Sequence, residues 1–425
     1  MTTFSSILPK LKREDFTHEA SYAQTRLPLY EAKSLFTNAY SDPEFYVLEQ
    51  ERVFATSWVA VGYLNQVAEP GQMMVTEVAG QSVVVTRDQT HQLRAYYNVC
   101  RHRGSQLVLK EGQSKRFQCP YHGWQYNLKG DCTAMPMFDQ GRAGKACQRL
   151  TEQDTNLLPV RVETWGFLIF INLDAEAMPL ATWLGDLPQR LAGYGLEHWQ
   201  VGRQQDFSLK SNWKLIAENF MEYYHLPWVH PELAQVSRVE DHYREQGPGM
   251  YTGMRTTPVS ANTDAGGWQG LPLMAELSEL EKMTGRFICL FPNVCFSLLP
   301  NHAFAMILNP RSCDFTLEST AIILPPGTAE TEGVGAALDE LMTFWQMVNQ
   351  QDVDIVEVVQ QGLGNLAYPG GRFSDPFEEP LHRFQNMVID RMVGIRDRIP
   401  AGDPVLEEVP LMASTAAPEP AAPVY

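Results

Sequence analysis

The chain has 425 residues, of which 44% are hydrophobic and 20% are charged, and its formal net charge is −17. This length exceeds one ordinary hydrophobic core and the composition is globular, so the sequence predicts two folded domains rather than a disordered or fibrous protein. The excess of acidic residues argues against nucleic-acid binding, because phosphate contacts require a positively charged surface.

The N-terminal segment, residues 1–40, lacks the apolar core of a signal peptide. No apolar run in the chain approaches the roughly 20 residues that a transmembrane helix requires. The seven cysteines are odd in number and irregularly spaced, unlike the disulfide framework of a secreted domain. We therefore expect a cytoplasmic protein without a membrane segment, and a disordered Ala/Pro-rich tail at 411–425.

The first domain is predicted at 41–173. It begins with a helix over 41–55 that starts at an Asp-Pro pair. Short segments rich in β-branched and aromatic residues follow, separated by Gly, Pro and Asp. This pattern predicts an antiparallel β structure over roughly 56–173.

The second domain is predicted at 174–410 and mixes both element types. A helix is expected at 213–226, where Ser211 or Asn212 can serve as the N-cap. Strand patterns come next, and a long helix is expected at about 335–362. Strands with segregated helices predict an α+β domain.

Two Cys/His pairs lie in the predicted β domain: Cys100-x-His102 and, after sixteen residues, Cys119-x-x-His122. A zinc site can use two cysteines and two histidines, but zinc fingers usually place both histidines on one helix. Here each loop supplies one cysteine and one histidine. This arrangement favours a two-iron cluster in which the thiolates hold one iron and the imidazoles hold the other.

These four residues, with Gly123 and Trp124 directly after them, resemble the motif of the Rieske iron–sulfur family in the version found in Rieske non-haem iron oxygenases. The resemblance implies a [2Fe-2S] cluster in an all-β domain. It also implies an α+β catalytic domain, in which a central antiparallel sheet is flanked by helices and a mononuclear iron is bound.

A second group of metal-binding side chains lies in the stretch ENFMEYYHLPWVHPEL. Glu222 and His225 are three residues apart and share a face of a helix. His230 comes five residues after His225 and would point away from it on a continuous helix. Because Pro227 ends or kinks a helix, it can turn His230 back toward the same point. The spacing is therefore compatible with a metal site.

Oxygen activation at a facial triad needs one carboxylate besides two histidines. In the helix predicted at 335–362, Asp352 falls on an otherwise apolar stripe. Its other members are Leu341, Trp345, Val348, Ile355 and Val359. A lone carboxylate on a core face is costly unless it is paired or binds metal. Asp354 is the alternative, but its stripe is polar, so Asp352 is the favoured third ligand.

The block N-W-K-x₃-E-N-x₂-E-x₂-H-x₄-H resembles the catalytic block of Rieske oxygenase alpha subunits. The resemblance implies that His225, His230 and Asp352 bind the mononuclear iron. It implies a homotrimer, in which Glu222 bridges one subunit's iron site and the neighbour's cluster. It also implies an NAD(P)H-dependent flavin or ferredoxin reductase that supplies the electrons.

Most members of the family carry Asp where this chain has Glu222. The glutamate pattern resembles the branch that oxidises choline, glycine betaine and carnitine, which implies a monooxygenase that hydroxylates a quaternary ammonium or methylated amine. Aromatic faces hold such cations through cation–π contacts. The candidate substrate-binding residues are Tyr223, Tyr224, Trp228, Phe296 and Phe220. The alternatives are the alpha subunit of an aromatic-ring-hydroxylating dioxygenase and an electron-transfer module without catalysis.

Overall fold

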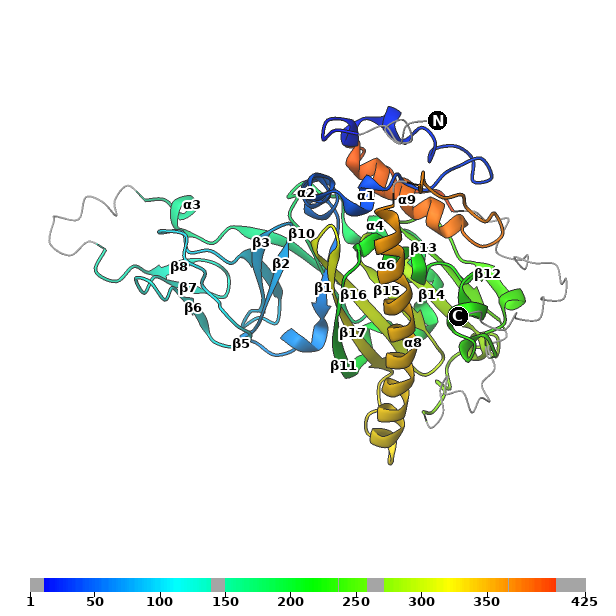
Figure 1. Ribbon diagram of the computed structural model, residues 1–425. Helices are drawn as coiled ribbons and strands as arrows, with labels where there is room; N and C mark the ends of the chain where they lie inside the picture. Colours follow the sequence, from blue (N-terminus) through cyan, green and yellow to red (C-terminus); the bar gives the residue numbers. More distant parts are fainter. Residues whose placement is uncertain (1–10, 139–149, 236, 258–270, 366, 403–425) are drawn as a thin grey trace. The chain divides into compact units, whose positions relative to one another are not determined.

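The computed structural model describes residues 11–138, 150–235, 237–257, 271–365 and 367–402. The chain divides into two compact units (Figure 1): Phe54–Ala177 forms one, and the chain up to Val53 together with the chain from Met178 forms the other. The first domain was expected to begin at residue 41, but helix α2 (Pro43–Arg52) belongs to the larger unit, where its Glu49 is buried. The tail at 411–425 lies outside the described residues.

The smaller unit is built from antiparallel strands, as the sequence predicts. Its larger sheet has the order β1-β10-β9-β4-β3-β2-β5, and its smaller sheet has the order β6-β7-β8. The strands are β1 (Val59–Tyr63), β2 (Gln72–Val78), β3 (Gln81–Arg87), β4 (Leu93–Tyr97), β5 (Gly112–Gln113), β6 (Arg116–Gln118), β7 (Gln125–Asn127), β8 (Cys132–Ala134), β9 (Pro159–Trp165) and β10 (Leu168–Asn172). A single-turn helix, α3 (Glu152–Thr155), lies between β8 and β9.

The larger unit contains a second antiparallel sheet with the order β11-β17-β16-β15-β14-β13-β12. Its strands are β11 (Gln200–Leu209), β12 (His242–Arg244), β13 (Tyr251–Thr256), β14 (Gly285–Leu290), β15 (Val294–Leu298), β16 (Ala303–Ser312) and β17 (Phe315–Leu324). Every residue of the central strand β15 is buried, which is typical of a strand covered on both faces.

Helices flank this sheet and complete the expected α+β fold. They are α1 (Asn38–Ser41), α2, α4 (Leu180–Leu184), α5 (Leu187–Arg190), α6 (Trp213–Phe220), α7 (Leu226–Val229), α8 (Val334–Leu363) and α9 (Glu379–Met392). Helices α6 and α8 contact each other and pack on one face of the sheet (Figure 1). None of the described helices combines the length and the apolarity that crossing a bilayer requires.

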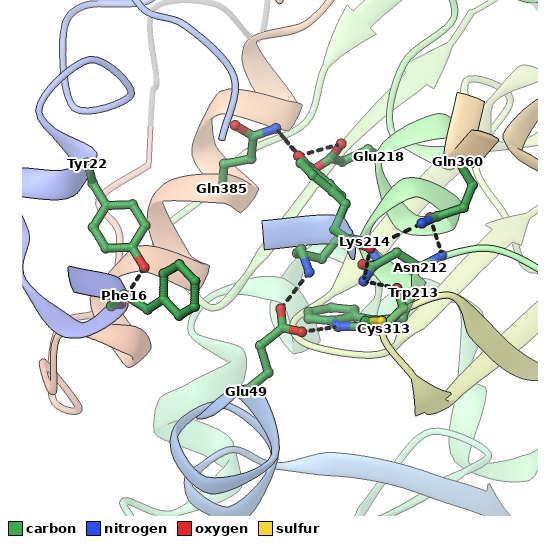
Figure 2. A network of polar contacts seen from close by, with 11 residues as sticks. Phe16, Tyr22, Glu49, Asn212, Trp213, Lys214, Glu218, Cys313, Gln360 and Gln385 are labelled. Carbon is green, nitrogen blue, oxygen red and sulfur yellow. Dashed lines mark hydrogen bonds and ion pairs between the residues drawn. The ribbon is translucent and has the colours of Figure 1, made fainter. Parts of the chain in front are cut away.

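A buried polar network holds the start of α6 in place (Figure 2). Of the two predicted N-caps, Ser211 and Asn212, the structure uses Asn212. Its side-chain oxygen accepts a hydrogen bond from Lys214 N at 3.0 Å, and its side-chain amide donates one to Cys313 O at 2.7 Å. Lys214 Nζ lies 2.6 Å from Glu49 Oε1, and both side chains are fully buried. A buried charge requires such a partner, so this pair ties α6 to α2.

The far end of α6 is held in the same way (Figure 2). Glu218 accepts hydrogen bonds from Tyr40 Oη at 2.9 Å and from Gln385 Nε2 at 3.0 Å. Burial raises the pKa of Glu218 to about 7. The residues of the N-W-K-x₃-E block thus anchor the helix that leads into the Glu222–His230 segment.

Candidate metal centres and active-site cavity

The two Cys/His loops of the smaller unit have the same backbone geometry. In the first, Cys100 O accepts from Gly104 N at 3.1 Å; in the second, Cys119 O accepts from Gly123 N at 3.0 Å. Both glycines have a φ of +74°, a left-handed conformation that other residues adopt only with strain. Each loop is therefore a tight turn that presents its cysteine and its histidine together.

The cysteines of these loops are buried and the histidines lie further out. Cys100 and Cys119 are each 2% exposed, whereas His102 is half-buried and His122 is exposed. Tyr126 Oη accepts from Arg101 N at 3.2 Å and lies 3.2 Å from Cys100 Sγ, so its own proton can reach the sulfur. Such donors stabilise thiolates bound to a cluster.

The imidazoles and the second thiol are also oriented by neighbours. Trp124 stacks on His102 with ring centroids 4.9 Å apart, and the two histidine rings lie 4.7 Å apart. Burial disfavours the Cys119 thiolate, but hydrogen bonds from the backbone of His122 and Tyr121 outweigh it, so the pKa of the thiol falls below its usual value.

The donor atoms of these loops fit a two-metal cluster better than a single zinc ion. In the described part of the chain, three such donors come within 4.8 Å of one another only at His225, His230 and Asp352. A tetrahedral zinc ion would require the four loop donors to converge on one point. In a [2Fe-2S] cluster of the Rieske type, two cysteine sulfurs coordinate one iron and two histidine nitrogens coordinate the other.

The helix that the sequence predicts up to Leu226 is shorter in the structure. Helix α6 ends at Phe220, because the Glu222 carboxylate accepts hydrogen bonds from the backbone of Tyr224 and of His225 (3.2 Å) and stabilises a turn instead. Pro227 does not end a helix: it lies in the first turn of α7, where a missing N–H costs nothing.

This single-turn helix explains the five-residue gap between the histidines. His225 is the N-cap of α7 and His230 is its C-cap. The two side chains therefore leave opposite ends of one helical turn, and their rings lie 5.1 Å apart.

The structure brings His225 and His230 together with Asp352 of α8. His230 Nε2 lies 2.8 Å and His225 Nε2 lies 3.6 Å from Asp352 Oδ1. Asp354, the alternative, is exposed and accepts a hydrogen bond from Gln350. Two imidazole nitrogens and one carboxylate that face a common point could hold a metal ion, and this donor set suits non-haem Fe(II).

The other nitrogen of each imidazole is held by a hydrogen bond. His225 Nδ1 donates to Glu222 Oε1 at 2.5 Å, and His230 Nδ1 donates to Gln351 Oε1 at 2.7 Å. Each bond fixes the tautomer that leaves Nε2 free for a metal. Glu222 thus lies behind a metal-facing histidine, with 11% of its side chain exposed.

These groups lie at the wall of a cavity in the larger unit. Its floor is one row of side chains across four strands: Met254 pairs with Phe287, Phe287 with Ser297, and Ser297 with Phe304. Residues paired across antiparallel strands point to the same face, so all four point into the cavity. Phe220 of α6 and Trp345 of α8 contribute further aromatic surface.

A smaller recess adjoins this cavity, and Phe220, Asn349 and Asp352 line both. The recess contains the buried carboxyl of Glu318, whose Oε1 accepts from Asn349 Nδ2 at 2.7 Å. The other oxygen of Glu318 has no hydrogen-bond partner among the described residues. Burial raises the pKa of this carboxyl to about 7, and the charge of Asp352 adds to the effect.

The predicted substrate-binding residues require correction, because none of the four principal candidates lines the cavity. Trp228 and Tyr224 are 62% and 54% exposed, on the outer side of the turn. Tyr223 is buried against His242, with ring centroids 4.1 Å apart. Phe296 neighbours Ser297 on β15 and therefore points to the opposite face of the sheet. Of the predicted aromatics, only Phe220 lines the cavity.

Sequence reasoning missed several residues of the site. Phe287 and Phe304 carry no local signal, since only the register of β14 and β16 on either side of β15 places both in the cavity floor. Trp345 was on the apolar stripe of Asp352, and that shared stripe was a usable signal. Nothing in the sequence indicates that Gln351 accepts a hydrogen bond from His230, except its position next to Asp352.

Comparison with known proteins now adds to this geometry. The Rieske [2Fe-2S] domain family matches residues 57–157, and the family described as the ring hydroxylating alpha subunit (catalytic domain) matches residues 196–394. The chain belongs to the Rieske non-haem iron oxygenases. The first match contains all four residues of the Cys/His loops, and the second contains the three residues that face one another in the cavity.

Individual relatives of this Rieske oxygenase span most of its length. It is 28% identical to the chloroplastic choline monooxygenase of Atriplex hortensis, covering 84% of this chain and 78% of the relative. It is 26% identical to the glycine betaine monooxygenase oxygenase subunit of Chromohalobacter salexigens, covering 84% and 85%. A solved quaternary ammonium Rieske monooxygenase, studied for carnitine oxidation and inter-subunit electron transfer, shares the fold with a TM-score of 0.72 at 22% identity, covering 91% and 100%.

Proposed function

We propose that this Rieske oxygenase is the oxygenase component of a monooxygenase that hydroxylates a quaternary ammonium or methylated amine. The observation that carries the proposal is the convergence of His225, His230 and Asp352 at the wall of an aromatic cavity. The relatives that cover 84% of the chain are named for choline and for glycine betaine, which supports this substrate class.

In this proposal Cys100, His102, Cys119 and His122 hold the [2Fe-2S] cluster, and His225, His230 and Asp352 hold Fe(II). When bound, the cluster supplies single electrons and the mononuclear iron activates O₂ for insertion into a C–H bond. The chain itself positions the substrate: Phe287, Phe304 and Trp345 provide apolar faces beside the metal-facing groups and exclude water from them.

Glu222 is proposed to connect the iron site to an electron source outside its own subunit. Its Oε1 accepts from His225 Nδ1, and a carboxylate there can accept a second donor from a neighbouring chain. We propose a homotrimer in which that donor is a cluster histidine, because His122 and part of His102 are exposed for such a contact. An NAD(P)H-dependent flavin or ferredoxin reductase would supply the electrons, in the cytoplasm.

The test combines purified chain, a reductase, NADH and O₂ with a panel of choline, glycine betaine, carnitine and trimethylamine, with products followed by mass spectrometry. We expect an oxygenated or demethylated product from at least one amine, coupled to NADH oxidation. Metal analysis should give about three irons per chain, two of them in the cluster. Coupled turnover of an aromatic acid or hydrocarbon, and of no amine, would favour the ring-hydroxylating alternative that the family description of residues 196–394 allows.

A further inference from the structure

The floor of the cavity has a depression between two aromatic rings. Along the cross-strand row, the small Ser297 lies between Phe287 and Phe304. Phe287 also contacts Phe220, with ring centroids 6.4 Å apart, and Phe304 stacks on Trp345, with centroids 4.7 Å apart and planes 2° from parallel. Two aromatic pairs thus flank the one floor position where a side chain is short.

The described lining of the cavity and its recess contains no lysine or arginine. The polar lining consists of neutral amides and hydroxyls, the metal-facing histidines, His242 and three carboxylates. The carboxylates are Glu222, Asp352 and Glu318.

His242 does not act as a cation in this lining. Its Nδ1 lies 2.7 Å from Arg238 O, and a carbonyl can only accept, so Nδ1 carries the proton and Nε2 accepts from Ser237 Oγ at 3.3 Å. Burial lowers the pKa of His242 to about 4, which agrees with a neutral ring. A substrate carboxylate would therefore find no charged partner from these residues.

From this charge distribution we propose that the substrate is a trimethylammonium or related onium cation without a carboxylate, with its head group over Ser297 between Phe287 and Phe304. The inference rests on the proposed function and narrows it: it selects choline-like alcohols and simple amines over the zwitterions glycine betaine and carnitine. The aromatic faces hold a cation. A zwitterion would bury its carboxylate without a lysine or arginine partner among the described lining residues.

The test uses the full-length protein and four probes: choline, its uncharged isostere 3,3-dimethyl-1-butanol, glycine betaine and L-carnitine. Binding is measured by isothermal titration calorimetry, and kcat/KM is measured by product formation with reductase and O₂. Choline should bind at least about tenfold more tightly than its isostere, because the shape is shared and only the cation differs. Choline should also exceed both zwitterions by at least about tenfold in kcat/KM.

Two variants test the placement. Phe304→Leu should weaken choline binding and leave the isostere unchanged, so that the ratio of the two affinities falls. Phe296→Leu is the matched control: it removes the same ring from the other face of β15 and should leave the ratio as in the wild type. Ser297→Lys puts a cation into the hollow and should shift the preference from choline toward glycine betaine.

The outcomes separate this inference from the proposed function. If glycine betaine or carnitine is the preferred substrate, the proposed function holds and this inference is overturned. Equal binding of choline and its isostere would also overturn it. If none of the amines is turned over while an aromatic compound is, the proposed function itself fails.

Discussion

The two candidate metal centres of this Rieske oxygenase are built in opposite ways. The cluster loops are local: each Cys/His pair lies within one tight turn, and the two turns have the same hydrogen bonds and the same glycine conformation. The iron triad joins both ends of the single-turn helix α7 to a residue of the long helix α8. Local turns determine the first site, whereas packing between elements distant in sequence determines the second.

The largest effect is expected from Asp352→Ala. Removing the carboxylate that lies near Nε2 of both His225 and His230 should release the mononuclear iron, so that the iron content falls from about three to about two per chain. Turnover should fall to background while the visible spectrum of the cluster stays unchanged. Asp354→Ala is the control, because that side chain is exposed, and it should retain iron and activity. Equal losses in both variants would contradict the assignment.

Lys214→Ala should destabilise the larger unit by about 3–5 kcal/mol, because it leaves the Glu49 carboxylate buried without its partner. Denaturant unfolding measures the change. Lys214→Met combined with Glu49→Leu removes both charges together and should recover much of the loss. If the single and double variants are equally unstable, the ion pair does not anchor α6.

The stability of the larger unit should depend on pH through Glu218. Its pKa is about 7 in the folded protein, against an ordinary value of 4.5, so the folded state holds the proton more tightly. The resulting stabilisation is complete below about pH 4.5 and is lost as the pH rises through 7, up to roughly 3 kcal/mol. Urea unfolding at pH 5 and pH 8 should show this loss, and Glu218→Gln should remove it. An unchanged pH slope in the variant would rule out Glu218 as the source.

Glu222→Gln should keep all three irons yet reduce coupled turnover by about 10–100-fold. The amide still fills the space beside His225, but it carries no charge to hold an electron-transfer contact between subunits. Single-turnover reduction of the iron site by the reduced cluster, followed by stopped flow, measures the step directly. Loss of the mononuclear iron would instead show that Glu222 supports metal binding alone.

The smallest effect is expected from Gly104→Ala in the cluster unit. No atom lies within 4 Å of the position that a Cβ would take, so the cost is the left-handed backbone alone, about 1–2 kcal/mol. Thermal unfolding followed at the cluster absorbance tests this. Loss of the cluster at ambient temperature would mean that the turn tolerates no strain.

The contrast also explains what the sequence could predict. The cluster ligands are regularly spaced within short loops, and Asp352 interrupts an apolar stripe, so both patterns are visible in one dimension. The end of α6 at Phe220 was not predictable. It depends on the Glu222 side chain, whose carboxylate accepts backbone hydrogen bonds that would be made to backbone carbonyls if the helix continued. The cavity floor was not predictable either: Phe287 and Phe304 meet only through strand register, and nearness to the histidines in sequence wrongly favoured Tyr224 and Trp228.

Candidate metal binding and the shaping of the cavity floor depend on different elements. The candidate metal ligands lie at the two ends of α7 and on α8. The floor residues Met254, Phe287, Ser297 and Phe304 each come from a different strand. Any of the four can be exchanged without altering a ligand or its hydrogen bond. Randomising these four codons together would give a small library of variants in which the substrate range changes and the candidate metal ligands His225, His230 and Asp352 are kept.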